Sequence, residues 1–215
     1  MKTNKLLVLS AMLILTTLLV SSCQGKPEYA YDTNTTETYN LSPDIDLKSV
    51  GSNQLPVDKE YAKDITDLTN RADLIVIVRV ISNGKAYVET IPTMNAEQGK
   101  KQGGPIRVAL TTTRLKVEEV LYGDEKSGEI ELVQVGYPGK DAGDTKVKNG
   151  DTMLVILKKN PDRNDYTSVA HEEALFIVQE DNTVVSLSDN VKIAKYDNTE
   201  MGLLVRDIKK AVQQP

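Results

Sequence analysis

The chain has 215 residues, of which 40% are hydrophobic and 27% charged, and its formal net charge is −5. This length and composition suit one globular domain with a sizeable core and exclude a wholly disordered chain. The acidic balance argues against a nucleic-acid partner, because neutralising phosphates requires a basic surface. The single Cys excludes a disulfide framework, a cysteine-based zinc site and a CxxC redox pair.

The N-terminus has the pattern of an export signal. Lys2 and Lys5 precede a charge-free apolar run at residues 6–20, which is too short to span a bilayer comfortably. The sequence LVSSC at residues 19–23 resembles the lipobox of bacterial lipoproteins. That resemblance implies cleavage before Cys23, a diacylglyceryl thioether on its thiol, and anchoring by acyl chains such as palmitate. A plain secretory signal with a chance Cys at the cleavage site is the alternative.

The segment that follows has the composition of a tether. Residues 24–58 are acidic, are rich in Asp, Asn, Thr and Ser, and show no helical or alternating apolar period. Such a segment buries too little apolar surface to offset its ordering entropy, so we expect it to be flexible. A partner-binding strip using Tyr29, Tyr31 and Tyr39 is the alternative. The expected organisation is a signal peptide at 1–22, the lipidated Cys and tether at 23–57, and a β-rich globular domain at 58–215.

The globular domain is expected to open with a helix capped by Asp58. Its apolar stripe at helical spacing consists of Tyr61, Ile65, Leu68 and Ala72. The β-branched run at residues 74–81 then predicts a buried strand. The dipeptide at residues 83–84, Asn-Gly, predicts a hairpin turn into a second strand at residues 87–91. The residues from 92 to 105 are expected to form a long loop.

An extended segment is predicted at residues 106–121. Its apolar residues change alternation parity after Leu110, which predicts a bulge or sharp bend near residues 111–113. Turn-forming residues occupy positions 122–128. Further strands are expected at residues 130–135, 153–157, 166–169, 174–178 and 184–187.

A second helix is predicted at the end of the chain, with Asn198 as its cap. Its apolar stripe, expected to seal one mouth or face of the sheet, consists of Met201, Leu204, Val205, Ile208 and Val212. Several short strands with bends, framed by two helices, predict a mainly β fold of the β-rich α+β type. We expect a small bent antiparallel sheet or an OB-type barrel with an N-terminal and a C-terminal helix.

Four segments carry a family resemblance. They are ADLIVIVRV at 72–80, LKVEEVLYGD at 115–124, GEIEL at 128–132 and NGDTMLVIL at 149–157. Together they resemble bacterial secreted domains of the netrin-like class, an OB-type barrel shared with tissue inhibitors of metalloproteinases. The resemblance covers residues 58–215, and its packing motifs bear on fold more than on function. It does not imply metalloproteinase inhibition, because that family uses a free N-terminal Cys, whereas Cys23 is expected to be lipid-bound.

Two short motifs look catalytic in isolation. Ser82 and Lys85 have Ser-x-x-Lys spacing, and Ser188-Asp189-Asn190 matches the second motif of penicillin-binding proteins and serine β-lactamases. That mechanism needs its Ser and Lys one helical turn apart, whereas residues 82 to 85 are expected to straddle a hairpin turn. The Lys-Thr-Gly element is also absent, so we do not expect this activity.

Three other features could be binding sites, but each has a simpler structural interpretation. His171, the only histidine, could join Glu172 and Glu173 in a weak metal site, but a solvated turn residue is the simpler interpretation. The cluster at residues 160–165 has calcium-loop composition but lacks the required Gly and Glu, so we expect a turn. With no Trp and one Phe, the chain offers few aromatic side chains for stacking bases or sugars.

We therefore expect a membrane-anchored lipoprotein that faces the extracytoplasmic side and carries a non-enzymatic binding module. Cys23, as the lipidation site, is the functional residue that we assign, and no catalytic, cofactor-binding or metal-binding residue is expected. The expected partners are the membrane, through the lipid on Cys23, and a protein or envelope ligand, with no nucleic acid and no cofactor. Two alternatives remain open: an extracytoplasmic hydrolase that depends on Ser82, Lys85 or His171, and an envelope assembly or chaperone-like factor.

Overall fold

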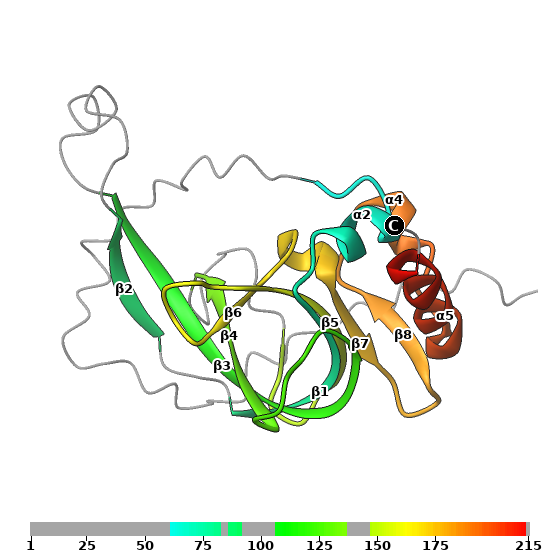
Figure 1. Cartoon of the computed structure of the whole chain (residues 1–215), viewed down its shortest axis with the longest axis horizontal. Helices are drawn as coiled ribbons and strands as arrows, with labels where there is room; N and C mark the ends of the chain where they lie inside the picture. Colours follow the sequence, from blue (N-terminus) through cyan, green and yellow to red (C-terminus); the bar gives the residue numbers. More distant parts are fainter. Residues whose placement is uncertain (1–60, 83–85, 92–105, 137–146, 214–215) are drawn as a thin grey trace, which may run out of the picture. The chain divides into compact units, whose positions relative to one another are not determined.

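The computed structural model describes residues 61–82, 86–91, 106–136 and 147–213, all within one compact unit, Tyr39–Pro215. This part of the chain is mainly β, as expected, with few helices (Figure 1). Its elements are α2 (Ile65–Asn70), β1 (Leu74–Ser82), β2 (Ala86–Ile91), β3 (Ile106–Tyr122), β4 (Glu129–Val135), β5 (Thr152–Lys159), β6 (Tyr166–Ser168), the 3-10 helix η1 (His171–Ala174), β7 (Leu175–Val178), β8 (Thr183–Ser186), α4 (Val191–Ala194), β9 (Thr199–Glu200) and α5 (Met201–Val212).

Five strands close into a barrel. β1 pairs with both β3 and β5, β3 pairs with β4, and β6 lies between β4 and β5. The resulting order β1-β3-β4-β6-β5-β1 is closed and is consistent with an OB-type barrel. The contact between β4 and β6 is parallel and consists of one pair, Leu132 with Tyr166, whereas the other barrel pairings are antiparallel.

Strand alternation divides the apolar side chains into two layers. Side chains of one parity on β1 and β5 fill the barrel, while those of the other parity, such as Ile75 and Ile156, face outward into a separate cluster. The main interior side chains are Leu74, Val76, Val78, Val80, Leu115, Ile130, Leu132, Met153, Val155, Leu157 and Tyr166. Both faces of β1 and β5 are therefore buried, which explains their continuous apolar runs.

The helices cover the outer face of the barrel on the side of β5 and β7 (Figure 1). Leu68 of α2 and Ile193 of α4 pack in one buried cluster with Leu204 and Ile208 of α5, and Phe176 of β7 lies against them. Leu204 and Ile208 are fully buried. The closing helix therefore docks on one face of the sheet through its predicted apolar stripe, as expected.

The predicted start of the first helix is wrong. α2 begins at Ile65, where the side chain of Asp64 accepts a hydrogen bond of 3.0 Å from the backbone N–H of Asp67. Asp58, the predicted cap, lies outside the described residues. Tyr61 is 66% exposed and precedes the helix, so it does not belong to the buried stripe.

The predicted cap of the last helix is also wrong. α5 begins at Met201, and Glu200 occupies the cap position without a side-chain hydrogen bond. Asn198 instead has a φ of 56° and leads into β9. An Asn tolerates this left-handed backbone better than most residues, which explains why it stands in the turn.

The predicted hairpin after β1 is wrong as well. Ser82 pairs with Arg114 and Ala86 pairs with Thr111, so β1 and β2 both run antiparallel to β3 and therefore in the same direction. Residues 83–84 lie outside the described residues. The two strands follow one another along one edge of β3 rather than folding back on each other.

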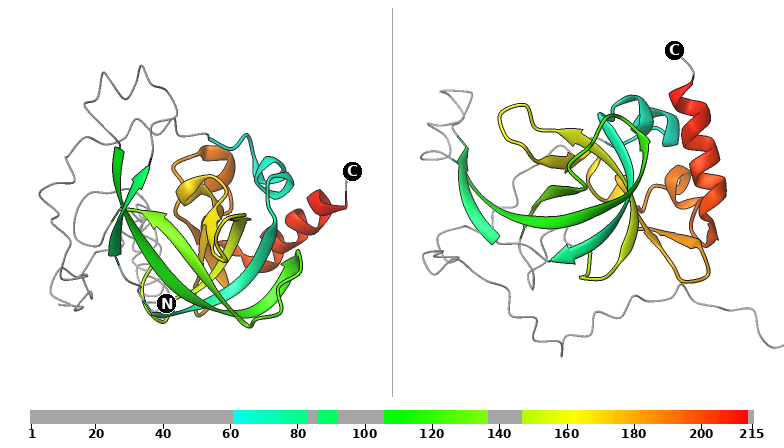
Figure 2. Two further views of the ribbon diagram at one scale, coloured as in Figure 1. Left: turned by 60° about the vertical axis from the view of Figure 1, so that its left-hand side comes forward. Right: turned by 60° about the horizontal axis from the view of Figure 1, so that its bottom comes forward.

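Near residues 111–113, where a bulge or sharp bend is predicted, β3 has no bulge and runs as one continuous curved strand (Figure 2). Its register with β4 has no shift. The parity change has another cause: Val108 and Leu110 pack with Val133 in a small separate cluster, whereas Leu115 points into the barrel. The register shifts that do occur lie along the pairing with β1.

The other predicted strands and the turn at residues 122–128 are confirmed, with ends that differ by at most two residues. The short elements α4, β9 and η1 were not predicted, because a single turn or a two-residue strand has no detectable period. The tether, the boundary at residue 58 and the loop at residues 92–105 lie outside the described residues. Within the described residues, no helix has the length and apolar character needed to span a membrane.

Gly123, in the turn after β3, is predicted to be required for packing. It has a φ of +92°, and a Cβ added there would lie 2.4 Å from the carbonyl oxygen of Asp73. Gly128 also has a positive φ of +73°, but nothing lies within 4 Å of an added Cβ. We expect Gly128→Ala to lower the free energy of unfolding by about 1–2 kcal/mol through backbone strain alone. Gly123→Ala should cost at least about 1 kcal/mol more. Urea denaturation measures both losses, and equal losses would contradict a packing role for Gly123.

Candidate functional site

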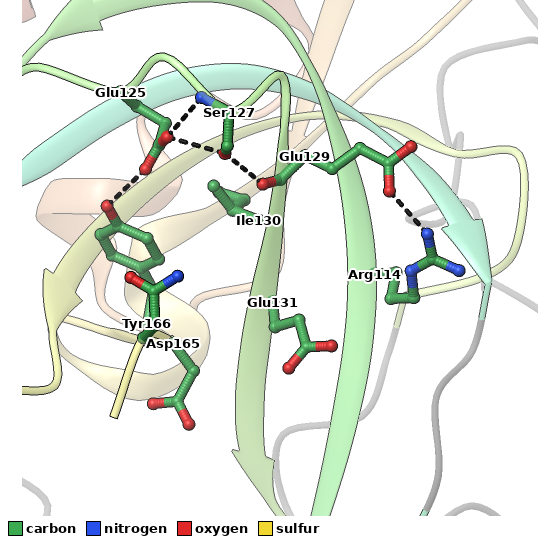
Figure 3. Close-up of a pocket in the computed structure, with 9 residues that line it drawn as sticks. Arg114, Glu125, Ser127, Glu129, Ile130, Glu131, Asp165 and Tyr166 are labelled. Atoms are coloured by element: carbon green, nitrogen blue, oxygen red, sulfur yellow. Dashed lines mark hydrogen bonds and ion pairs between the residues drawn. The ribbon is translucent and has the colours of Figure 1, made fainter. Parts of the chain in front are cut away.

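A polar cavity of about 460 Å³ lies where β3, β4 and β6 meet the turn at residues 123–128 (Figure 3). The side chains that line it are Arg114, Glu125, Ser127, Glu129, Ile130, Glu131, Asn164, Asp165 and Tyr166. Four of these nine residues are acidic and one is basic, so the wall of the cavity carries a net negative charge.

The cavity lies at the barrel's least paired seam. β6 has only three residues and touches β4 through the single pair Leu132–Tyr166. Both of these side chains belong to the interior cluster. Because successive side chains of a strand point to opposite faces, Glu131 points to the outer face of β4, and Asp165 directly precedes β6. Arg114 pairs with Glu131 across the β3–β4 ladder and lies on the same face.

Glu125 is tied into the structure and shapes the cavity. Its carboxylate accepts hydrogen bonds from the backbone N–H groups of Lys126 and Ser127 at 2.8 Å, the Ser127 hydroxyl at 2.7 Å and the Tyr166 hydroxyl at 2.8 Å. Partial burial raises the pKa of Glu125, but these hydrogen bonds outweigh it and lower the pKa to about 2. Burial and the hydrogen bond to Glu125 raise the pKa of Tyr166 to about 12. The turn at residues 123–128 is thereby fastened to β6.

Two arginines are paired with acids at the rim of the cavity. Arg114 contacts Glu129 at 2.6 Å, and both side chains are about half exposed. Arg163, in the turn between β5 and β6, contacts Glu89 of β2 at 2.8 Å and Asp165 at 3.0 Å. The hydrogen bond to Glu89 raises the pKa of Arg163. The turn that carries Asp165 is therefore linked to β2.

Two carboxylates in the wall keep open hydrogen-bond acceptors. Asp165 is 8% exposed, and its Oδ1 atom is buried without a hydrogen-bond partner in the described part of the chain. Glu131 is exposed and makes no ion pair or hydrogen bond among the residues that the structure describes. Figure 3 shows the two side chains directed to the same side of the cavity. The arrangement can accept N–H or O–H donors from a bound molecule.

The residues of the β-lactamase-like motifs are not brought together as a catalytic group. Ser82 ends β1, and Lys85 lies outside the described residues. The Ser188 hydroxyl accepts a hydrogen bond of 2.9 Å from the backbone N–H of Asn190. Asn190 caps α4, and its side-chain amide donates to the carbonyl oxygen of Ala62 at 2.8 Å. The motif at residues 188–190 thus serves as a helix cap.

His171 begins the 3-10 helix η1 with a φ of 51° and is partly buried rather than fully solvated. Its neighbour Glu173 is buried and accepts a hydrogen bond of 2.7 Å from the backbone N–H of Ala62. Across the described residues, no three His, Cys, Asp or Glu side chains are grouped to hold a metal ion. The residues from 160 to 165 form the turn between β5 and β6, as predicted, and the backbone N–H of Asn160 donates to the carbonyl oxygen of Asp165 at 3.0 Å.

Cys23, the predicted lipidation site, lies outside the described residues. The sequence did not identify Glu131 and Asp165, because their proximity depends on a single parallel pair between strands that are not neighbours in the chain. One signal was available: Ile130 and Leu132 alternate with Glu129 and Glu131, which marks an acidic outer face on β4.

Comparison with known proteins assigns neither a family nor a function to this chain. No protein-family model matches this sequence, and no curated protein matches it significantly.

The contact between Tyr166 and Glu125 predicts a pH-dependent contribution to stability. The folded pKa of Glu125, about 2, lies below its ordinary value of 4.5, so the stabilisation is present above pH 4.5. It is lost as the pH falls from 4.5 to about 2. We expect Tyr166→Phe to lower the free energy of unfolding by about 1–2 kcal/mol at neutral pH, with a difference that shrinks in acid. Denaturation across this pH range measures it, with Tyr122→Phe as the exposed control. A difference that does not vary with pH would contradict the prediction.

Proposed function

We propose that this chain is a lipid-anchored module on the extracytoplasmic face of the cell membrane that binds a protein or envelope ligand without turnover. The observation that carries the binding role is the cavity at the β4–β6 seam, where Glu131 and Asp165 keep acceptors open. The polar groups of Ser188 and Asn190, in contrast, are engaged in capping α4. This engagement favours a binding module over a hydrolase that would use the β-lactamase-like motif at residues 188–190.

We also propose that the domain is a netrin-like barrel of the OB type. Support comes from the location of the four segments that carry the resemblance. They contain most of β1, the second half of β3, the start of β4 and most of β5, which are parts of four of the five barrel strands. The same residues that prompted the resemblance therefore build the barrel wall.

The anchoring part of the proposal rests on the lipobox that ends in Cys23. The two acyl chains of a diacylglyceryl thioether contribute roughly 0.8 kcal/mol per buried methylene, and two chains give stable membrane binding. We predict that wild-type protein incorporates a labelled fatty acid in cells and that Cys23→Ser abolishes the labelling. The uncut signal could still retain the variant at the membrane, so labelling rather than fractionation is the measurement. Wild-type protein without label, or equal label in the variant, would contradict a lipid anchor.

The binding part of the proposal is tested inside intact cells. Asn164 is an exposed residue at the cavity, and Glu119 is an exposed residue of β3 that does not line it. A photo-crosslinking amino acid at position 164 should form a specific adduct that the same group at position 119 does not form. Identical adduct patterns at the two positions would contradict a ligand-binding role for the cavity.

A further inference from the structure

We propose that the cavity binds an organic cation that donates N–H groups, and that the guanidinium of an arginine on a basic peptide fits it best. This inference rests on the proposed binding function and adds the chemical class of the ligand. Its basis is the pair of open carboxylates at the seam, Glu131 of β4 and Asp165 beside β6. The other acids of the wall are already engaged, Glu125 by Ser127 and Tyr166, and Glu129 by Arg114.

The Asp165 carboxylate has one oxygen without a hydrogen-bond donor in the described part of the chain. Asp165 is more than nine-tenths buried, its Oδ2 contacts Arg163 at 3.0 Å, and its Oδ1 has no partner in the described part of the chain. A buried carboxylate oxygen is rarely left without a donor, because its desolvation is then uncompensated. Asp165 lines the cavity, which makes a donor bound there the candidate for this missing hydrogen bond.

Glu131 and Asp165 both lie next to the single residue pair that joins β4 and β6. Leu132 pairs with Tyr166, so the residues that precede them, Glu131 of β4 and Asp165 directly before β6, both come to the cavity wall. Two carboxylates in one wall carry like charges, and a bound cation offsets their repulsion. A planar guanidinium presents several N–H donors in a fixed fork and can reach both carboxylates at once.

The charged residues that line the cavity are predominantly acidic. Arg114 pairs with Glu131 across the β3–β4 ladder, but its guanidinium contacts Glu129 at 2.6 Å instead. Among the lining residues, four acids face one arginine, which disfavours an anionic ligand. Among the described residues, no three His, Cys, Asp or Glu side chains are grouped for a metal ion, so two carboxylates suit a cation held by hydrogen bonds better.

The test measures fluorescence anisotropy with the full chain in a nonionic detergent. The probes are tetra-arginine, tetra-lysine and tetra-citrulline peptides carrying the same uncharged dye, at a salt concentration of about 0.15 M that screens weak surface attraction. Citrulline keeps the shape of arginine but lacks its charge. We expect tetra-arginine to bind and tetra-citrulline to bind at least about tenfold more weakly. Tetra-lysine of equal affinity would support the cation class and overturn the preference for a guanidinium over an ammonium.

Three variants that each remove one negative charge localise the binding. Glu131→Gln and Asp165→Asn should each weaken tetra-arginine binding at least about tenfold, because each removes a charge-assisted hydrogen bond. Glu119→Gln, on β3 and away from the cavity, should change the affinity less than about twofold. Glu131→Gln is decisive, because Glu131 has no partner in the described structure whose loss would unfold it. Its thermal midpoint should stay equal to the wild-type value or rise, as repulsion from Asp165 is removed.

The outcomes separate this inference from the proposed function. Equal binding of the citrulline peptide, or equal affinities for all three variants, would overturn the cationic ligand. If tetra-arginine does not bind while the crosslinker at position 164 captures a ligand in cells, the cationic inference is wrong and the binding module stands. If tetra-arginine binds as expected but position 164 captures no more than position 119, the site chemistry stands and the envelope-ligand role is wrong.

Discussion

The antiparallel ladder between β1 and β5 is the constraint on which the rest of the domain depends. It pairs six residues of each strand, from Leu74 with Leu157 to Arg79 with Thr152, and it closes the barrel. Closure removes exposed strand edges and commits one face of each strand to the interior. The other face, which includes Ile75, then needs its own cover, and α2, α4 and α5 supply it. One ladder thus fixes both the barrel core and the position of the helical layer.

The cavity lies where the closure of the barrel has the fewest residue pairs, between β4 and β6. β5 pairs with β7 through Thr152–Val155 and with β6 through Leu157–Lys159, so β6 continues the barrel wall only briefly. β6 forms only one residue pair with β4, so side chains of the turns on either side complete the surface of the barrel there. Glu125 and Tyr166 close one part of it by hydrogen bonding. Glu131 and Asp165 line the remainder with acceptors still open.

The sequence predicted the strands, the turn before β4 and the docked closing helix, because these depend on local periodicity. It failed at Asn83-Gly84, since a turn signal states where a chain bends and not which strand the next segment pairs with. It failed at Tyr61 because helical spacing alone does not say where a helix begins. The sequence could not predict the carboxylate pair Glu131 and Asp165, and here the reason is stronger. Their proximity depends on a contact between non-consecutive strands, and acidic residues are too numerous in this chain to single out two.

The tandem arrangement of β1 and β2 along β3 leaves a two-stranded arm outside the barrel, formed by β2 and the first residues of β3 (Figures 1 and 2). Its own apolar cluster is small, with Val108, Leu110 and Val133 buried. A segment with so little buried surface opens sub-globally at lower free energy than the core, and its amides exchange with solvent sooner. The arm is joined to the cavity through the contact of Glu89 with Arg163. Opening of the arm therefore removes the Glu89 contact of Arg163 and leaves Arg163 with Asp165, so the charge beside the cavity depends on a peripheral unit.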